Sequence, residues 1–365
     1  MKVLAVTGAS GGHIYPALGF LERLKKEIPT AEALLVLPSR SIKAGFSSVG
    51  YGIKYVTSAK LSFSLSPKSV IAFLSFIRGA WEGLLIILKF KPDVVVGFGS
   101  IDSVPLVMAA WFLRIKTIVH EQNVLPGKAN RFLARFADKV AVSFPQSDRY
   151  LGSFKGKITL TGNPLRQALR RMGREEALGL LGLDKDKFTI LVMGGSQGSR
   201  RINAAFLEAI GLIKTRSSLQ AVHILGKEEC ALARESYNKL GVKAGVFNFT
   251  DSMEIVYNAA DLAITRAGAT TISELIYFRL PAILVPYPFA YSHQFENAKV
   301  LEEKSAGIII RDEELTAGLL EGLIDGFIRG PERLALMRKR YEDIPGFDAS
   351  GNLVKALDFL NRGVI

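Results

Sequence analysis

The feature that most constrains the fold of this chain is a pattern that occurs twice: an apolar strand, a glycine-rich turn and a helix. The first copy is VLAVTGASGGHIYPALGFL at residues 3–21, and the second is ILVMGGSQGSRRINAAFL at residues 190–207. Glycines let the backbone turn tightly between strand and helix, as at the start of a Rossmann-like unit. Because 365 residues exceed one ordinary core, the repeat predicts two such domains in tandem.

Short apolar runs alternate with helical patterns along the whole chain, which predicts βαβ units and an α/β fold with parallel sheets. The expected strands are 2–6, 33–37, 93–98, 117–120, 139–144, 188–193, 221–225, 260–265 and 282–286. The expected helices are 14–27, 67–90, 103–114, 127–137, 200–214, 229–240, 270–278 and 293–305. Turn residues in TGNP place the boundary between an N-terminal domain, 1–161, and a C-terminal domain, 162–346. We expect the helix within 347–365 to cross back to the first domain.

Composition and charge exclude several classes of protein. A single cysteine, Cys230, excludes a disulfide scaffold and a cysteine-rich zinc site, and the four histidines are too dispersed for a metal site. The start of the chain lacks a signal peptide pattern, so we expect a protein that is not exported.

Residues 1–161 hold 21 Lys and Arg against 9 Asp and Glu, whereas the remainder holds 26 against 25. This asymmetry predicts a polyanionic partner for the first domain: a nucleic acid, an anionic membrane or a phosphate-rich substrate.

The first glycine loop is a candidate phosphate-binding loop, and a tight turn between strand and helix is its alternative interpretation. Ser10, Gly11 and Gly12 would present backbone amides at a helix N-terminus, where a phosphate is favoured. The spacing differs from G-x-G-x-x-G, and Arg40 follows the second strand where a dinucleotide site needs an acidic residue, so a dinucleotide is not expected. His13 heads the helix and is a candidate general base, since a histidine titrates near neutrality; its alternative role is to cap the helix.

Three loops of the second domain follow predicted strands. Ser196 in GGSQGS could donate its hydroxyl to a phosphate oxygen. In RAGATTISE the amides near Ala269 and Thr270 could face a diphosphate. Glu274 has two interpretations: it completes a capping box with a threonine three residues earlier, or it accepts the hydroxyls of a ribose. The third loop, PYPFAYSHQFEN, offers His293 and Gln294 beside aromatic rings.

A further loop, HEQN at residues 120–123, lies at the predicted carboxyl end of a strand in the first domain. Asn123 both donates and accepts hydrogen bonds, which suits sugar hydroxyls. Across all these loops the sequence offers neither a Walker lysine, nor G-x-S-x-G, nor a carboxylate pair suited to glycoside hydrolysis. What remains is typical of a site for a sugar joined to a diphosphate.

Residues 70–88 form an unusually apolar segment, VIAFLSFIRGAWEGLLIIL, with 14 apolar residues of 19. Its length approaches a membrane span, but Arg78 and Glu82 lie near its middle, where charges are costly. We expect a helix that contacts an anionic membrane surface, extended by residues 111–116; an ordinary buried helix is the alternative.

Taken together, these motifs resemble the MurG family of peptidoglycan glycosyltransferases, and the resemblance covers essentially the whole chain. It is carried by TGASGGHIYPAL, KPDVVVGFGS, HEQN with the helix that follows, TGNPLR, LVMGGSQGSRRIN and the stretch from RAGATTISEL to SHQFENA. The resemblance implies the GT-B fold, two Rossmann-like domains facing across a cleft. It also implies transfer of N-acetylglucosamine from UDP-N-acetylglucosamine (UDP-GlcNAc) to lipid I, undecaprenyl-pyrophosphoryl-MurNAc-pentapeptide, with inversion at the anomeric carbon, to form lipid II.

The same resemblance assigns roles to individual residues. Ser196 would contact the α-phosphate, Ala269 and Thr270 the diphosphate, and Glu274 the ribose. The backbone around Phe249 and Thr250 would read the uracil edge. Arg166 would lie at the nucleotide and Asn123 at the sugar, with His13 as the favoured base. Ser10, Gly11 and Gly12 of the first glycine loop are also expected to bind UDP-GlcNAc. The resemblance also implies a peripheral position on the cytoplasmic face of the bacterial membrane. We expect no cofactor and no metal, and no nucleic acid because an interleaved aromatic motif for it is missing.

The chain departs from the family pattern at two loops. The family has two adjacent glutamines at the sugar, where this chain has His293 and Gln294. In the first domain, Ser100 and Ile101 replace a Gly-Tyr pair that would face the acceptor diphosphate. Two alternatives remain open from the residues: a UDP-GlcNAc 2-epimerase of the GT-B fold, and a glycosyltransferase acting on another lipid acceptor.

Overall fold

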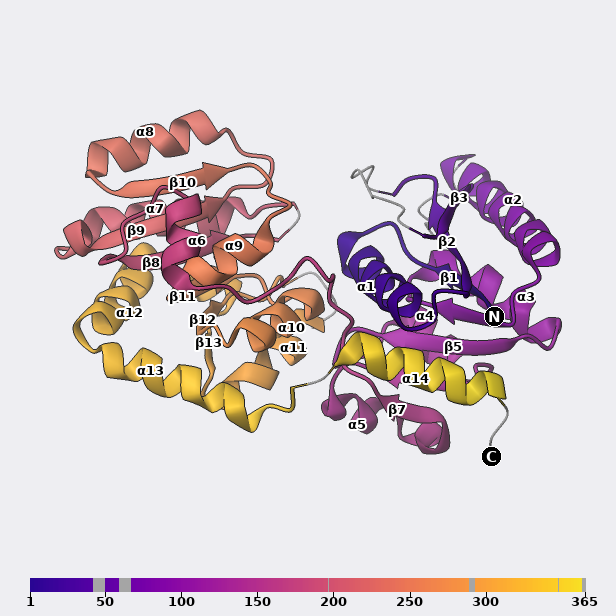
Figure 1. The fold of residues 1–365 in the computed structure, drawn as a ribbon. Helices are drawn as coiled ribbons and strands as arrows, with labels where there is room; N and C mark the ends of the chain where they lie inside the picture. Colours follow the sequence, from indigo (N-terminus) through magenta and orange to yellow (C-terminus); the bar gives the residue numbers. More distant parts are fainter. Residues whose placement is uncertain (42–49, 59–66, 196, 289–292, 347, 363–365) are drawn as a thin grey trace. The chain divides into compact units, whose positions relative to one another are not determined.

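A computed structural model of the chain describes residues 1–41, 50–58, 67–195, 197–288, 293–346 and 348–362. The chain forms two compact units, residues 1–167 with 347–365 and residues 168–346, each built on its own parallel sheet (Figure 1). The first boundary thus follows Gln167, after the TGNP turn, and not residue 161.

The sheet of the first unit has the strand order β3-β2-β1-β4-β5-β6-β7, and every neighbouring pair is parallel. Its strands are β1 (Lys2–Val6), β2 (Glu32–Pro38), β3 (Gly52–Val56), β4 (Val94–Gly97), β5 (Lys116–Glu121), β6 (Lys139–Val142) and β7 (Ile158–Leu160). Its helices are α1 (Gly11–Glu27), α2 (Pro67–Phe90), α3 (Val104–Phe112), α4 (Lys128–Leu133), α5 (Asp148–Leu151) and α14 (Ala349–Arg362).

Both faces of this sheet are buried, which explains the unbroken apolar runs of its central strands. Alternate side chains of β1 point to opposite faces: Val3 and Ala5 pack with α1 and α14, whereas Leu4 and Val6 pack with α2 and α3. Although α14 ends the chain, it lies beside α1, and its Leu357 is fully buried in the core of the first unit (Figure 1).

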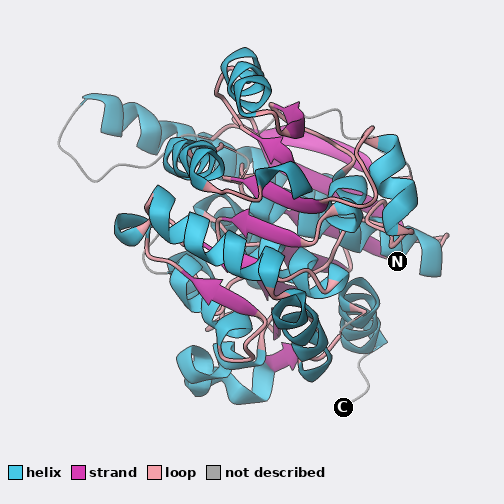
Figure 2. Ribbon diagram, turned by 90° about the vertical axis from the view of Figure 1, so that its left-hand side faces the viewer, coloured by secondary structure: helices cyan, strands magenta, loops and turns pink. Residues whose placement is uncertain are grey.

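The second unit repeats the plan, with the strand order β10-β9-β8-β11-β12-β13. Figure 2 shows that the strands, in magenta, are flanked by helices, in cyan. Its strands are β8 (Phe188–Met193), β9 (Leu219–Ile224), β10 (Lys243–Phe247), β11 (Leu262–Thr265), β12 (Ala282–Leu284) and β13 (Gly307–Ile309). Its helices are α6 (Arg174–Leu180), α7 (Arg200–Leu212), α8 (Cys230–Leu240), α9 (Met253–Ala259), α10 (Ala269–Phe278), α11 (His293–Glu302), α12 (Ala317–Arg329) and α13 (Pro331–Arg340). In each unit the chain leaves the sheet's carboxyl edge through the glycine loops, so this edge gathers the candidate site residues.

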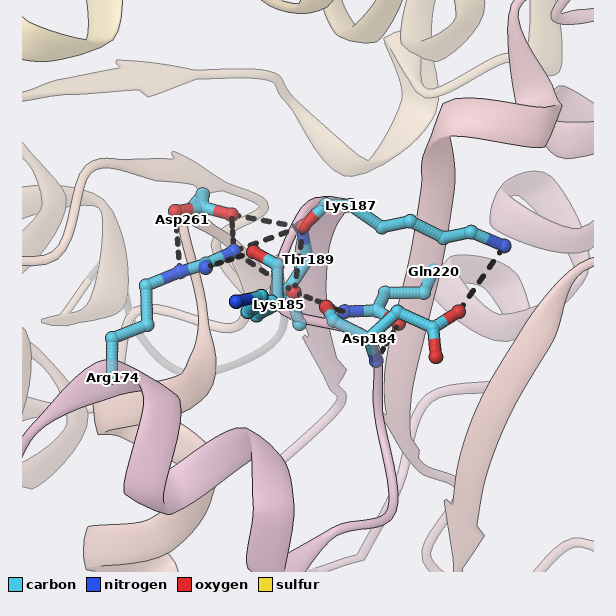
Figure 3. Close-up of polar contacts among 7 residues, drawn as sticks. All are labelled: Arg174, Asp184, Lys185, Lys187, Thr189, Gln220 and Asp261. Atoms are coloured by element: carbon cyan, nitrogen blue, oxygen red, sulfur yellow. Dashed lines mark hydrogen bonds and ion pairs between the residues drawn. The ribbon is translucent and has the colours of Figure 1, made fainter.

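The amino edge of the second sheet is closed by a separate polar cluster (Figure 3). Arg174, the first residue of α6, forms a bidentate pair with Asp261, with N–O distances of 3.1 and 2.7 Å. The Arg174 guanidinium also donates to the Lys187 carbonyl, and Gln220 donates to the Thr189 hydroxyl at 2.9 Å. Since these groups occupy the starts of β8, β9 and β11, the cluster fastens α6 to the sheet at the edge remote from the glycine loops.

Candidate functional site

The first glycine loop of the N-terminal unit forms the start of α1. The Ser10 carbonyl accepts the backbone N–H groups of His13 and Ile14 at 3.0 and 3.1 Å, so the helix begins at Gly11 as the first turn closes. Ser10 and Gly12 are exposed, whereas Gly11 is buried. The first turn contains no acidic residue, so its amides and the helix dipole favour an anion there.

His13 lies on the first turn of α1, against the loop that follows β4. A Cβ atom added to Gly99, whose φ is +80°, would lie 3.3 Å from His13 Nδ1. Burial lowers the pKa of His13, and the negative charge of Glu121, the Phe98 carbonyl and the Gln122 side chain oppose that shift. His13 is therefore held as a neutral imidazole near neutral pH, the state that a general base requires.

The HEQN loop is organised by a buried carboxylate. Glu121 is 1% exposed, and its two oxygens accept four hydrogen bonds. Oε1 accepts the backbone N–H of Asn123 at 2.8 Å and its Nδ2 at 3.1 Å, while Oε2 accepts Gly127 N–H at 3.0 Å and Asn130 Nδ2 at 2.8 Å. Asn123 thus has its amide orientation set by Glu121, a residue that we did not single out from the sequence.

Two neighbours in the same loop are fully buried. His120 Nε2 lies 3.0 Å from the Gly162 carbonyl, and His120 Nδ1 lies 3.2 Å from Gln122 Nε2. Gln122 Nε2 also donates to the Phe98 carbonyl at 3.1 Å. Burial lowers the pKa of His120 to about 4, so this histidine is neutral at physiological pH.

Arg166 belongs to the N-terminal unit and lies against α1. Its guanidinium stacks over the Tyr15 ring, with 4.5 Å between the guanidinium carbon and the ring centroid. Its Nε is buried and has no hydrogen-bond partner among the described residues. A Cβ atom added at Gly19 would lie 2.4 Å from the Leu165 carbonyl oxygen and would clash with it. Glycine at this position therefore permits the close approach of α1 to the segment that carries Arg166.

In the second unit the RAGATT loop forms the start of α10. The helix begins at Ala269 with Gly268 as its N-cap, so Ala269 and Thr270 supply first-turn N–H groups that lack intrahelical acceptors. Thr270 Oγ1 is buried and unpartnered within the described parts of the chain. The capping-box interpretation of Glu274 is wrong, because it requires Thr271 as the N-cap and the helix has already begun two residues earlier.

Glu274 lies farther along α10, where it is 8% exposed. Its Oε2 accepts a hydrogen bond from the Tyr257 hydroxyl at 2.7 Å. Tyr257, from α9, is itself buried and stacks on Phe278 with 5.0 Å between ring centroids. The carboxylate is therefore fixed in direction, as a residue that recognises paired hydroxyls needs to be.

Gln294 and His293 begin α11. Gln294 Oε1 accepts the backbone N–H groups of Ala267 and Tyr287, at 3.2 and 2.9 Å. Because Oε1 faces these two N–H groups, Nε2 points away from them. A ligand contact of Gln294 would therefore use the Nε2 donor. His293 is half-buried.

Arg266 is the residue at this edge that the sequence reasoning missed. Its guanidinium donates to Asp312 at 2.5 Å, to Ser199 Oγ at 2.8 Å and to the Val285 carbonyl at 3.1 Å. These partners belong to the loops after β13, β8 and β12, so one buried cation ties the candidate donor loops together. Its position directly after a strand was the available signal.

Two predicted donor contacts are less defined. Ser196 lies outside the described residues. Phe249 is 55% exposed, and the neighbouring Thr250 hydroxyl accepts the Ser252 N–H at 3.1 Å. The sequence-predicted residues therefore form two groups, one at the carboxyl edge of each sheet. The N-terminal group is Ser10, Gly11, Gly12, His13, Asn123 and Arg166; the C-terminal group is Phe249, Thr250, Ala269, Thr270, Glu274, His293 and Gln294.

Comparison with known proteins identifies the family. Residues 3–142 match the glycosyltransferase family 28 N-terminal domain, and residues 189–346 match the corresponding C-terminal domain. The chain is 37% identical to the UDP-N-acetylglucosamine--N-acetylmuramyl-(pentapeptide) pyrophosphoryl-undecaprenol N-acetylglucosamine transferase of Halothermothrix orenii, over 100% of both chains.

Solved structures show the same fold. The chain is similar to Acinetobacter baumannii MurG, with a TM-score of 0.75 and 24% identity over 98% of this chain and 99% of that one. It is also similar to a putative UDP-N-acetylglucosamine 2-epimerase of Listeria monocytogenes, with a TM-score of 0.70 and 16% identity over 100% and 97%. Both similarities show the expected GT-B fold class. The sequence relatives show the family: this chain belongs to the MurG family of N-acetylglucosamine transferases.

Proposed function

We propose that this protein transfers N-acetylglucosamine from UDP-GlcNAc to lipid I, with inversion, to form lipid II. The observation that carries the proposal is membership of the MurG family over the full length of both chains. The site geometry supports it, because each sheet edge offers glycine-loop amides, and polar side chains fixed in direction lie beside them.

The C-terminal unit is the proposed donor site. Ala269 and Thr270 would bind the diphosphate through the first-turn amides of α10, and Glu274 would accept the ribose hydroxyls. Ser196 would bind the α-phosphate, and the Phe249–Thr250 backbone would bind the uracil. Arg166, from the N-terminal unit, would bind the nucleotide. Gln294 would meet the sugar as a donor through Nε2, with His293 beside it, while Asn123 would contact the sugar from the N-terminal unit.

The N-terminal unit is the proposed acceptor site. The acceptor sugar hydroxyl attacks the anomeric carbon of N-acetylglucosamine while His13 takes the hydroxyl proton. The bond between the anomeric carbon and the β-phosphate oxygen breaks, and its electron pair leaves with UDP. Negative charge grows on the β-phosphate, where helix N-terminal amides such as those of α10 are fixed donors.

We further propose that the protein lies peripherally on the cytoplasmic membrane face. Within the described residues, Ser69–Phe90 is the one helix long and apolar enough to cross a membrane. The exposed apolar residues of α2 are Val70, Ile71, Phe73, Leu74, Ile77, Trp81, Leu85 and Leu88. Trp111, Phe112 and Leu113 at the end of α3, which packs on α2, extend this surface. Lysines near α2 suit an anionic bilayer.

Transfer of labelled sugar from UDP-GlcNAc to a short-chain lipid I analogue, with EDTA present, tests the function. Formation of the lipid II analogue supports donor and acceptor together. Release of UDP only with a different lipid would assign another acceptor, and N-acetylmannosamine formed from UDP-GlcNAc alone would replace the proposal with the epimerase reaction.

His13→Ala tests the assigned base. We expect kcat to fall about 100-fold or more, because a positioned general base contributes about that factor. Turnover within a few-fold of the unsubstituted protein would remove His13 from this role. Binding of UDP-GlcNAc, measured by calorimetry, should be nearly unchanged and serves as the control for folding.

A further inference from the structure

We propose that Asn248 is a positioning residue for nucleotide recognition. Its side chain fixes the start of the Phe249–Thr250 segment to the loop at residues 226–228, so that the backbone of this segment can read the uracil. The inference deepens the proposed function and rests on it, because the uracil contact belongs to that proposal. All the residues involved lie in the C-terminal unit, at the carboxyl ends of β9 and β10 and beside the start of α7.

The hydrogen-bond ladder between β9 and β10 ends at Asn248. The Gly226 N–H donates to the Asn248 carbonyl at 3.1 Å, which is the last backbone bond between the two chain segments. Among the residues described, the backbone N–H and C=O groups of Phe249 and Thr250 have no backbone partner. These two residues therefore follow directly on a fixed edge of the sheet, while their own backbone donors and acceptors are available to a ligand.

The Asn248 side chain continues the attachment where the ladder stops. Its Nδ2 donates to the Gly226 carbonyl at 3.1 Å and to the Glu228 carbonyl at 2.6 Å. Its Oδ1 accepts the proton of the Cys230 thiol at 3.2 Å. The orientation of the amide follows from these partners, because only the NH2 group can donate to two carbonyls. One side chain thus spans the loop from Gly226 to the first residue of α8.

The loop at residues 226–228 also packs against the second glycine loop, at residues 194–199, backbone against backbone. Gly198 and Gly226 both have a positive φ, +74° and +76°. A Cβ atom on either glycine would clash with the backbone of the opposite loop, so neither position accepts a side chain. The loop that Asn248 holds therefore contacts the proposed phosphate loop on one side and leads to the proposed uracil contact on the other.

The expected effect of Asn248 is on the base and not on the fold. Asn248 is exposed, so its side chain adds little to the packing of the core. Uracil presents an N3–H donor beside a carbonyl oxygen, whereas cytosine presents an acceptor N3 beside an amino group. A backbone C=O and N–H held in place match uracil and reject cytosine, since hydrogen-bonding groups left unpaired in a binding site are costly.

Calorimetric titration of the full-length protein with UDP and with CDP tests the proposal without an acceptor. Asn248→Ala removes the three side-chain bonds, and we expect the Kd for UDP to rise about 10-fold. The Kd for CDP should rise no more than about twofold, because its base already lacks the matching contacts. Discrimination between the two bases therefore falls, and an unchanged ratio of the two Kd values would overturn the proposal.

Asn248→Asp separates the two ends of the amide. It keeps an acceptor for the Cys230 thiol, but it turns an oxygen toward the Gly226 and Glu228 carbonyls, which cannot donate to it. We expect UDP to bind this variant at least as weakly as it binds Asn248→Ala. Binding of UDP as tight as in the unsubstituted protein would show that the Nδ2 bonds are unnecessary and would overturn the proposal.

Asn258→Ala is the matched control, because Asn258 makes three bonds of a similar kind elsewhere in the same unit. Its Nδ2 donates to the Arg170 and Glu254 carbonyls at 3.0 and 2.7 Å, and its Oδ1 accepts the Met172 N–H at 3.1 Å. It lies near the end of α9 that leads into β11, on the amino side of the sheet. This variant should leave both Kd values unchanged, and an equal rise in the Kd for UDP in both alanine variants would contradict a specific role for Asn248.

The transfer assay distinguishes failure of this inference from failure of the proposed function. Asn248→Ala should raise KM for UDP-GlcNAc about 10-fold and leave kcat within about threefold, since the uracil contact is the same in the ground state and the transition state. An unchanged KM in a protein that transfers the sugar would overturn the role of Asn248 alone. If the unsubstituted protein binds UDP and discriminates against CDP but transfers nothing to lipid I, the acceptor assignment fails and the role of Asn248 stands. Binding of neither nucleotide would overturn both.

Discussion

Ser100 has a backbone conformation that side-chain-bearing residues seldom adopt. Its φ of 71° and ψ of 156° fall in a region that is essentially reserved for glycine, and glycine is the residue that the family pattern has here. Its hydroxyl donates to Asp102 at 2.9 Å, and Asp102 in turn pairs with Arg40 at 2.6 Å. The strain is thus stored in the loop after β4, beside His13 and Gly8.

Two substitutions separate the strain at Ser100 from its hydrogen bond. Ser100→Gly and Ser100→Ala both remove the hydroxyl, but only glycine relaxes the backbone. We expect the glycine variant to be more stable than the alanine variant by about 1–2 kcal/mol. At ordinary backbone positions the order is reversed. Urea unfolding of both variants measures the difference, and a more stable alanine variant would contradict it.

Two buried histidines make stability depend on pH. Burial lowers the pKa of His120 to about 4 and of His223 to about 3, from the ordinary 6.5. The unfolded chain therefore binds more protons between these values, and stability falls as pH decreases below about 6.5, by up to about 1.4 kcal/mol per pH unit for each histidine. Urea unfolding at pH 7 and pH 5 checks the slope. Proton NMR showing either imidazole titrating near pH 6.5 in the folded protein would contradict it.

The loops at the carboxyl edges of the sheets are easier to identify from the sequence than the side chains that orient the residues in them. His13 and Asn123 were selected because they follow strands in polar or glycine-rich loops, and their roles stay predictions. Glu121 was passed over, because its four hydrogen bonds depend on how the chain folds back to Gly127 and Asn130. The same holds for Arg266, whose partners come from three loops distant in sequence.

At the scale of elements, the nine predicted strands are all present, and the four that were missed are β3, β7, β10 and β13. These four are the edge strands of the two sheets. A central strand buried on both faces produces an unbroken apolar run, whereas an edge strand is partly exposed and reads as a loop. In Gly52–Val56, for instance, Gly52, Lys54 and Tyr55 are exposed and only Val56 is buried. The missing signal is therefore a consequence of topology.

The cluster around Arg174 predicts a loss of stability without a loss of activity. Arg174→Met removes the bidentate partner of Asp261, so we expect the free energy of unfolding to fall by about 1–3 kcal/mol. Because the cluster closes the amino edge of the second sheet, away from the glycine loops, kcat and KM should stay unchanged in the folded protein. Thermal unfolding and the transfer assay measure both. A raised KM with unchanged stability would place the cluster in the donor site instead.

At the scale of the whole molecule, charge and apolar surface coincide in one unit. Residues 1–161 carry a net charge of +12, and the exposed face of α2 belongs to the same unit. The helix of a soluble protein normally buries its large apolar side chains. Ile71 and Trp81 are instead 64% and 61% exposed, which is typical of an interaction surface. An anionic bilayer satisfies both features, since it accepts apolar side chains and attracts the surrounding lysines.

The membrane proposal predicts binding to anionic vesicles that depends on α2 and on salt. Leu74→Gln with Trp81→Gln should weaken co-sedimentation with phosphatidylglycerol vesicles about 10-fold or more, because two exposed anchors are lost. Leu212→Gln with Leu336→Gln, similarly exposed on the second unit, is the matched control and should bind normally. Binding of the unsubstituted protein should decline as salt rises to about 0.5 M, since the charges are screened. Equal binding by both double variants would mean that α2 is not the contact, and transfer to a water-soluble acceptor should be equal in all three proteins.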